Sequence, residues 1–163
     1  MTISIDYNKL GIGLNTLEKN MKTFLLQSDD ELPLVAEVLI QLRPQYTIES
    51  LIEQINKQRE LGYHIAYVKE GNKVLSVAGF VEGEKLAWGK SIYIDDLVTD
   101  ENSRSTGAGT LLIDWFKSYC KEIGCKQLHL DSGVQRFQAH KFYLREGFAI
   151  SSHHFSIENI GIK

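Results

Sequence analysis

The sequence predicts a mixed α/β fold in a single domain. Segments in which apolar and polar residues alternate, as in strands, are interspersed with segments in which apolar residues recur every three or four positions, as in helices. The early strands are separated only by short turns, which favours an antiparallel half, whereas the later strands are separated by helices, which favours strand–helix–strand units. At 163 residues and 43% hydrophobic content, the chain is long enough for one well-buried core.

The elements are predicted in the order β-α-α-β-β-β-α-β-α-β, around a central mixed sheet of six to seven strands. Residues 1–20 have weak periodicity and are interpreted as an N-terminal extension, and residues 21–163 as the folded domain. The predicted elements are a strand at 22–27, helices at 28–42 and from Thr47 to near Gly62, strands at 63–70, 73–82 and 86–99, a helix from near Gly109 through Ile123, a strand at 126–132, a helix at 134–146 and a last strand at 148–157.

Several boundaries follow from local chemistry. Ser28 and Glu31 have the spacing of a capping box for the first helix, and Thr47 is a suitable N-cap for the second. The pair Gly71-Asn72 predicts a hairpin turn, and Gly83 predicts the next turn.

Composition excludes several classes of protein. A net charge of −3 and a pI near 6.0 argue against a general nucleic-acid binder, which needs concentrated basic residues. No stretch of about 18 apolar residues predicts a transmembrane helix, and no signal peptide is evident, so a cytoplasmic protein is expected. Cys120 and Cys125 are spaced for neither a metal site nor a disulfide framework, which favours reduced thiols and no metal.

The stretch "NSRSTGAGTLL", from Asn102 to Leu112, has the composition of a phosphate-binding turn. A helix begins within it, and the first turn of a helix offers unpaired backbone N–H groups and a positive dipole end. Gly107 and Gly109 allow a ligand to approach the backbone closely, and Arg104 adds a positive charge. The pattern is neither a Walker P-loop nor a complete dinucleotide fingerprint, so by itself it leaves a plain surface turn open.

Two motifs together resemble the GNAT family of N-acetyltransferases. Arg104-x-x-Gly107-x-Gly109 is similar to the Arg/Gln-x-x-Gly-x-Gly/Ala signature of that family, and "AHKFYLREGF" resembles its second motif, about thirty residues later. The resemblance covers about residues 21–157. It implies a sheet that splays between the long fourth strand and the fifth, and an acetyl-CoA-dependent acetyltransferase acting on a primary amine.

The resemblance also implies the donor site. The pyrophosphate of acetyl-CoA would rest on the backbone N–H groups of a continuous segment, and the pantetheine arm would pair with the preceding strand. The backbone N–H of Val98 is the candidate for stabilising the oxyanion. The residues implied are Leu97, Val98 and Thr99 in the strand and Arg104, Ser105, Thr106, Gly107, Ala108, Gly109 and Thr110 in the turn.

Catalytic roles are implied in the same way. Tyr143 occupies the position of the general acid, since a phenol stays protonated at neutral pH. Asp96 is the first candidate for the general base, and because neighbouring strand residues point to opposite faces, Asp95 would lie on the other side. Arg136 replaces an Asn common in relatives, and could contact a CoA phosphate or an acidic group of the acceptor.

Other polar residues have weaker claims. Glu82 is more simply a solvated turn carboxylate. His153 and His154 are expected on opposite faces of the last strand, where a structural or exposed role is favoured over that of a base. The aromatic residues expected near the cleft are Tyr46, Tyr63, Trp88 and Tyr93.

The resemblance predicts direct transfer to a small-molecule or peptide amine in a ternary complex. Two alternatives stay open: a non-catalytic acyl-CoA-binding or regulatory domain, and a toxin-type enzyme that acetylates aminoacyl-tRNA, against which the acidic net charge argues. The sequence does not identify the acceptor, and it leaves a homodimer open.

Overall fold

The structure is a computed structural model that describes residues 20–161. The extension predicted at 1–20 therefore lies, except for Asn20, outside the described residues. The chain divides into two compact units, one extending to His129 and the other beginning at Leu130. Among residues 20–161, no helix combines the length and the apolar character needed to cross a bilayer.

The first unit contains an antiparallel sheet between two layers of helices. Its elements are β1 (Lys22–Leu25), a 3₁₀ turn η2 (Asp29–Glu31), α1 (Leu32–Leu39), α2 (Ile48–Arg59), β2 (Tyr63–Glu70), β3 (Lys73–Lys85), β4 (Gly89–Thr99), η3 (Glu101–Ser103) and α3 (Ala108–Glu122). The strand β5 (Gln127–Leu130) spans the boundary between the units, and the second unit contains α4 (Phe137–Arg145).

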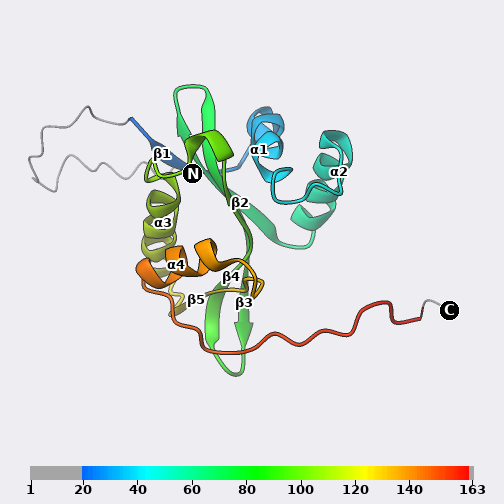
Figure 1. Cartoon of the computed structure of the whole chain (residues 1–163), viewed down its shortest axis with the longest axis vertical. Coiled ribbons are helices and arrows are strands. Elements are labelled where there is room, and N and C mark those ends of the chain that lie inside the picture. The colour runs from blue at the N-terminus through cyan, green and yellow to red at the C-terminus, as the bar shows by residue number, and fades with distance from the viewer. Residues whose placement is uncertain (1–19, 162–163) are drawn as a thin grey trace, which may run out of the picture. The chain divides into compact units, whose positions relative to one another are not determined.

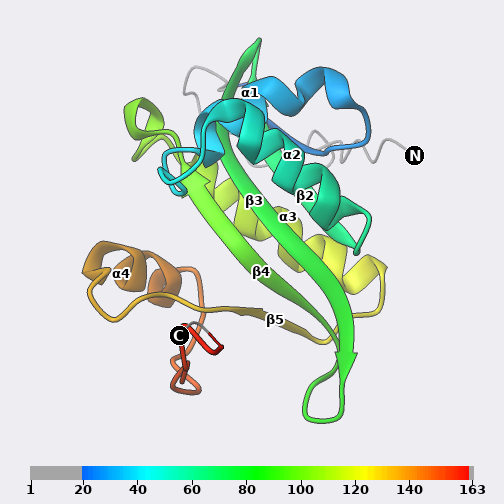
Figure 2. The same ribbon diagram turned by 90° about the vertical axis from the view of Figure 1, so that its right-hand side faces the viewer.

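The described strands form one five-stranded sheet in the order β1-β2-β3-β4-β5, and the first three neighbouring pairs are antiparallel. In Figure 1, α1 and α2 lie on one side of these strands and α3 lies on the other. Figure 2 shows β3 and β4 as one long hairpin that crosses the length of the unit. The predicted α/β class is thus confirmed, with five strands in place of six to seven.

Each helical layer packs on its own apolar core. Tyr63, Ile65 and Val77 pack against buried side chains of α1 and α2, such as Val35 and Ile55. On the opposite face, the ring of Phe80 meets aromatic rings of α3 at centroid distances of 5.0 to 6.3 Å, namely Trp115, Phe116 and Tyr119. Aromatic pairs in such edge-on arrangements stabilise a core beyond the area they bury. The two faces of the sheet can therefore be told apart by their partners.

The N-terminal cap predicted for α2 is confirmed, whereas the one predicted for α1 is not. Thr47 caps α2 through a capping box with Ser50, as the N-cap prediction required. The capping box predicted for Ser28 and Glu31 is wrong, because the Glu31 carboxylate instead pairs with Lys69 Nζ at 2.7 Å. The chain enters α1 through η2, and the α-helix itself begins at Leu32.

Two other predictions are wrong. Gly83 does not form a turn, because it pairs with Ser91 inside the ladder and the hairpin closes beyond it, before Gly89. Residues 148–157 form no strand. Their apolar side chains, including Ile150 and Phe155, are exposed, so the alternating pattern in that segment has no buried face to stabilise a strand.

Candidate active site

The turn before α3 has the backbone geometry of an anion cradle. Gly107 is the N-cap of α3 with φ of 95°, and it has no side chain to cap the first-turn N–H groups. Ser105 is also left-handed, with φ of 61°, and a Cβ built on Gly107 would have no atom within 4 Å. Thr106 Oγ1 donates to the Ser103 carbonyl at 2.7 Å, which fixes the turn. Left-handed residues beside a helix start turn successive N–H groups to the same side, where they can bind an anion.

Asp100, which the sequence did not single out, anchors this turn to the rest of the unit. Its carboxylate accepts from Gln41 Nε2 at 3.0 Å and from Ser103 Oγ at 2.8 Å, and it pairs with Lys73 Nζ at 3.0 Å. Gln41 also accepts from the Glu101 backbone N–H at 3.0 Å. These contacts join the segment after α1, the start of β3 and η3 at one buried carboxylate, next to a cavity of about 300 Å³.

The Asp100 contacts predict a defined loss of stability in acid. Hydrogen bonding from Gln41, supported by Ser103 and Lys73, lowers the pKa of Asp100 to about 2. A lowered folded-state pKa contributes stability above the unfolded pKa of about 4, and this contribution is lost as pH falls through about 2. We expect the free energy of unfolding of wild type to fall by about 1 to 2 kcal/mol more than that of Asp100→Asn across this interval. Urea unfolding between pH 5 and 2 tests this, and parallel curves would contradict it.

The hydrogen bonding of β4 determines which of its N–H groups are available. Asp100 N–H donates to the Leu75 carbonyl on β3 at 2.9 Å, and the register continues without a shift back to Asp96. Because direction alternates along a strand, the N–H of Val98 is directed toward β3, whereas those of Leu97 and Thr99 are directed away from it. Leu97 and Thr99, rather than Val98, are therefore placed to pair with a ligand.

A β-bulge lies just upstream of these residues. Gly79 pairs with Asp96 and Phe80 with Ile94, so Asp95 has no partner on β3. Simple alternation would put Asp96 on the same face as Ile94, which faces α3 with Phe80. The bulge shifts that alternation by one residue and turns Asp96 to the face of α1 and α2.

The Asp96 carboxylate is buried and occupied at both oxygens. Arg43 binds Oδ1 through Nε at 2.7 Å and through Nη2 at 2.6 Å, and the Tyr63 hydroxyl donates to Oδ2 at 2.7 Å. Burial, together with the charge and hydrogen bond of Asp96, strongly raises the pKa of Tyr63. The residue predicted as general base is thus one end of a tether between β4, β2 and the chain after α1.

Asp95, by contrast, is exposed. Its backbone carbonyl accepts from Arg43 Nη2 at 3.3 Å, and the residue has no partner on β3 because it lies at the bulge. Partial burial and the neighbouring Asp96 charge raise the pKa of Asp95, opposed by the charges of Arg43 and Lys85. Asp95 therefore holds its proton more readily than an ordinary aspartate.

Two predicted site residues, Tyr143 and Arg136, belong to the second unit. Tyr143 is half-buried on α4, and its ring meets those of Phe142 and Phe148 at 5.6 and 5.8 Å. Burial raises the pKa of Tyr143, against the opposing charge of Arg136, so the phenol stays protonated far above neutral pH. Arg136 is exposed at the N-cap of α4.

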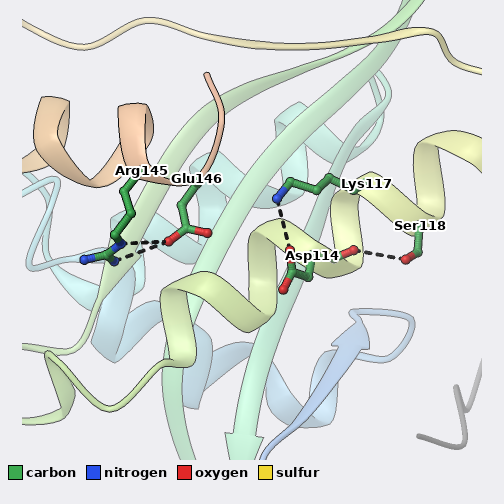
Figure 3. Close-up of polar contacts among 5 residues, drawn as sticks. All are labelled: Asp114, Lys117, Ser118, Arg145 and Glu146. Carbon is green, nitrogen blue, oxygen red and sulfur yellow. Dashed lines mark hydrogen bonds and ion pairs between the residues drawn. The ribbon is translucent and has the colours of Figure 1, made fainter. Parts of the chain in front are cut away.

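Charged pairs elsewhere are local to their helices. Figure 3 shows Lys117 bound to Asp114 at 3.1 Å on α3, and Arg145 bound to the adjacent Glu146 at 3.3 Å at the end of α4. The exposed Lys117 is outside the candidate site and provides a control position.

The remaining candidates have other partners. The Tyr119 hydroxyl donates to Glu82 at 2.8 Å, and His154 pairs with Asp131 at 2.9 Å in the irregular segment after α4. Cys120 and Cys125 are both buried and free, and burial raises the pKa of Cys120 to about 11, as expected of unreactive thiols. The part of the chain that the structure describes contains no group of three or more side chains suited to hold a metal ion.

Comparison with known proteins gives a consistent result. The family model described as "Acetyltransferase (GNAT) family" matches residues 26–148. The chain is 30% identical over 121 residues to an uncharacterized N-acetyltransferase, YhdJ, of Bacillus subtilis, covering 72% of this chain and 84% of the relative. It is 32% identical over 63 residues to the aminoalkylphosphonate N-acetyltransferase of Salmonella typhimurium, covering 39% of this chain and 41% of the relative.

Among solved structures, an aminoglycoside N-acetyltransferase in complex with CoA superposes with a TM-score of 0.74 at 12% identity, covering 90% of this chain and 99% of the other. At that identity the likeness concerns the fold alone.

Proposed function

Because the chain belongs to the GNAT family of acetyltransferases, we propose that it transfers the acetyl group of acetyl-CoA directly to a primary amine of a small molecule or peptide. The single observation that carries the donor half of this proposal is the uncapped start of α3 behind two left-handed residues, Ser105 and Gly107. Such a cradle suits a pyrophosphate, because backbone N–H groups and the helix dipole both favour negative charge.

The residues present fit acetyl-CoA. The segment from Arg104 to Thr110 would hold the pyrophosphate, and the N–H groups of Leu97 and Thr99 would pair with the pantetheine arm. Acetyl-CoA would supply an activated thioester. The N–H of Leu97 takes the oxyanion role that the resemblance implied for Val98, because it is directed away from β3. Arg136 stays a candidate contact for a phosphate.

Proton transfers complete the reaction. An amine acceptor has a pKa of about 10 and enters as an ammonium, so its nitrogen must lose two protons on becoming an amide. We assign the first of these protons, lost before attack, to the Asp95 carboxylate, which passes it to solvent. Tyr143 gives the proton of its hydroxyl to the departing sulfur and is reprotonated by the second proton of the attacking nitrogen, so the products are an amide, a thiol and one proton released to solvent.

Asp95 is preferred to Asp96 for a geometric reason. Asp96 is saturated by Arg43 and Tyr63, whereas Asp95 is exposed at the bulge, two residues before Leu97. Two strand residues span about 7 Å, which allows one acceptor to contact both Asp95 and a thioester held at Leu97. Asp96 then serves to hold Arg43 and Tyr63 in place.

The experiment that tests the function is a thiol-release assay with acetyl-CoA and a panel of acceptors: alkylamines, polyamines, aminoalkylphosphonates, aminoglycosides and peptide N-termini. Turnover with at least one amine, accompanied by the acetylated product in the mass spectrum, is expected. Tight acetyl-CoA binding without turnover on any class would favour a non-catalytic acyl-CoA-binding domain instead.

Arg104→Gln tests the cradle separately. Arg104 is exposed beside the turn, so its charge adds to phosphate binding without supporting the core. We expect the Kd of acetyl-CoA to rise about fivefold, as for one partly screened charge pair. Calorimetric titration measures this, with Lys117→Gln as the matched control. If Arg104→Gln and Lys117→Gln bind acetyl-CoA with the same Kd, Arg104 does not contribute to phosphate binding and the proposed position of the pyrophosphate is wrong.

A further inference from the structure

The end of the β3–β4 hairpin holds an ammonium group over aromatic rings. Lys85 Nζ lies 4.5 Å from the ring centroid of Trp88 and 5.3 Å from that of Tyr93. The Trp88 ring also stacks on that of His129, with centroids 3.8 Å apart and an interplanar angle of 17°. Cations bind favourably within about 6 Å of an aromatic centroid, and two rings that share one ammonium make a better site than a single ring.

The same ammonium lies within electrostatic reach of a carboxylate. Burial and the Asp96 charge raise the pKa of Asp95, the carboxylate at the bulge, and the charge of Lys85 opposes that rise. The other nearby cation, Arg43, is already bound to Asp96. Trp88 and Tyr93 thus provide two π faces, which is the chemistry that recognises an alkylammonium, while the Asp95 carboxylate lies nearer to Leu97 and stays available to the attacking nitrogen. Lys85 is an exposed side chain that any soluble ammonium could replace.

The register gives the separation of this cluster from the proposed transfer point. Tyr93 pairs with Val81 and Leu97 with Ala78, so the two are three β3 residues apart, because the bulge adds a residue to β4 alone. Three strand residues span about 10 Å. An acceptor that places one nitrogen near Leu97 can therefore place a second cationic group between Trp88 and Tyr93 if its two nitrogens lie roughly that far apart.

We propose that Trp88 and Tyr93 form an organic-cation site for a second ammonium group of the acceptor, and that Lys85 occupies this site in the free protein. The inference rests on the proposed acetyl transfer for its substrate class, which is a di- or polyamine. The binding site itself is defined without reference to catalysis. Lys85 then acts as an intramolecular competitor, so its removal strengthens the binding of such an amine.

The test is titration of the full-length protein without acetyl-CoA, followed by NMR. The probe is spermidine, and the readout is the indole N–H of Trp88, with the buried Trp115 as internal reference. Lys85→Gln is expected to lower the Kd of spermidine about two- to fivefold, the factor corresponding to one exposed cation–π contact. Trp88→Leu, followed at the Asp95 backbone amide, is expected to raise that Kd by a similar factor. Lys117→Gln should leave it unchanged.

The direction in which Lys85→Gln changes the Kd of spermidine shows whether Lys85 competes with the ligand. A Kd that is unchanged or higher in Lys85→Gln would overturn the proposal, because a purely structural lysine would not compete with ligand. Equal affinity of wild type for spermidine and n-butylamine would overturn it as well, since the monoamine lacks the second charge. The proposed function fails differently: spermidine would bind with the expected order of affinities, yet no amine would be acetylated.

Discussion

Gly79→Ala is expected to lower the free energy of unfolding by about 3 kcal/mol and the Tm by about 6 to 12 °C. A Cβ at this position would lie 1.5 Å from Tyr63 Oη and 2.1 Å from Cζ. Tyr63 is 4% exposed and cannot swing into solvent without leaving the α1–α2 core. The substitution therefore forces the ring aside and breaks its hydrogen bond to Asp96, which leaves buried polar atoms unpaired.

The chain offers a matched control on the same strand. A Cβ built on Gly83 meets no atom within 4 Å, so Gly83→Ala should leave stability unchanged or slightly raised. In a Tyr63→Val background, where the obstructing ring is absent, adding Gly79→Ala should cost less than about 1 kcal/mol. Denaturant unfolding of the four variants measures this coupling, and similar effects of Gly79→Ala and Gly83→Ala would refute the assigned contact.

Tyr143→Phe should reduce kcat about 100-fold with little change in the Kd of acetyl-CoA. Removing the phenolic proton takes away the proposed acid but keeps the ring that meets Phe142 and Phe148. The measurements are steady-state kinetics with the best acceptor from the panel and calorimetric titration of acetyl-CoA. A kcat within twofold of wild type would show that another group protonates the thiolate.

The control and the pH profile separate a chemical role from a structural one. Tyr119→Phe removes a phenol that is bound to Glu82 and lies outside the proposed chemistry, so kcat should be retained. Burial raises the pKa of Tyr143, so its proton is present at lower pH and is lost only as pH rises through the raised value. The kcat of wild type should accordingly show no alkaline decline below about pH 10. An earlier decline that persists in Tyr143→Phe would belong to a different group.

The features that could be predicted from the sequence are those determined by neighbouring residues. Thr47 and Ser50 are three residues apart and form their capping box locally. Gly71-Asn72 closes the β2–β3 hairpin, and Gly107 marks the start of α3, because a left-handed residue is needed at that point. The α/β class follows from the same local patterns.

The remaining features depend on residues far apart in the chain. Glu31 forms an ion pair with Lys69 and does not cap the first helix. Asp100 accepts a hydrogen bond from Gln41, which lies 59 residues away in the chain. The occupation of Asp96 by Arg43 and Tyr63 involves separations of 53 and 33 residues, which no local spacing records. Alternation does not locate the face of Asp96 either, because it assumes an unbroken strand and the bulge at Asp95 breaks it. The role of Tyr143 and the acceptor identity stay predictions.

The bulge makes the length of β4 matter as much as its composition. Before Asp95 the even-numbered residues of β4 face α3, whereas after it the even-numbered residues face α1 and α2. This one position therefore determines how the two halves of the strand alternate relative to each other. Deleting Asp95 would leave Asp96 opposite Gly79 and Ile94 opposite Phe80, so the ladder would close without a bulge and both halves of β4 would keep their present faces. A single residue deleted from the regular part of the strand would instead shift the register by one and turn one half of β4 over. The bulge therefore makes Asp95 a position where the strand can lose a residue without exchanging the side chains of its two faces.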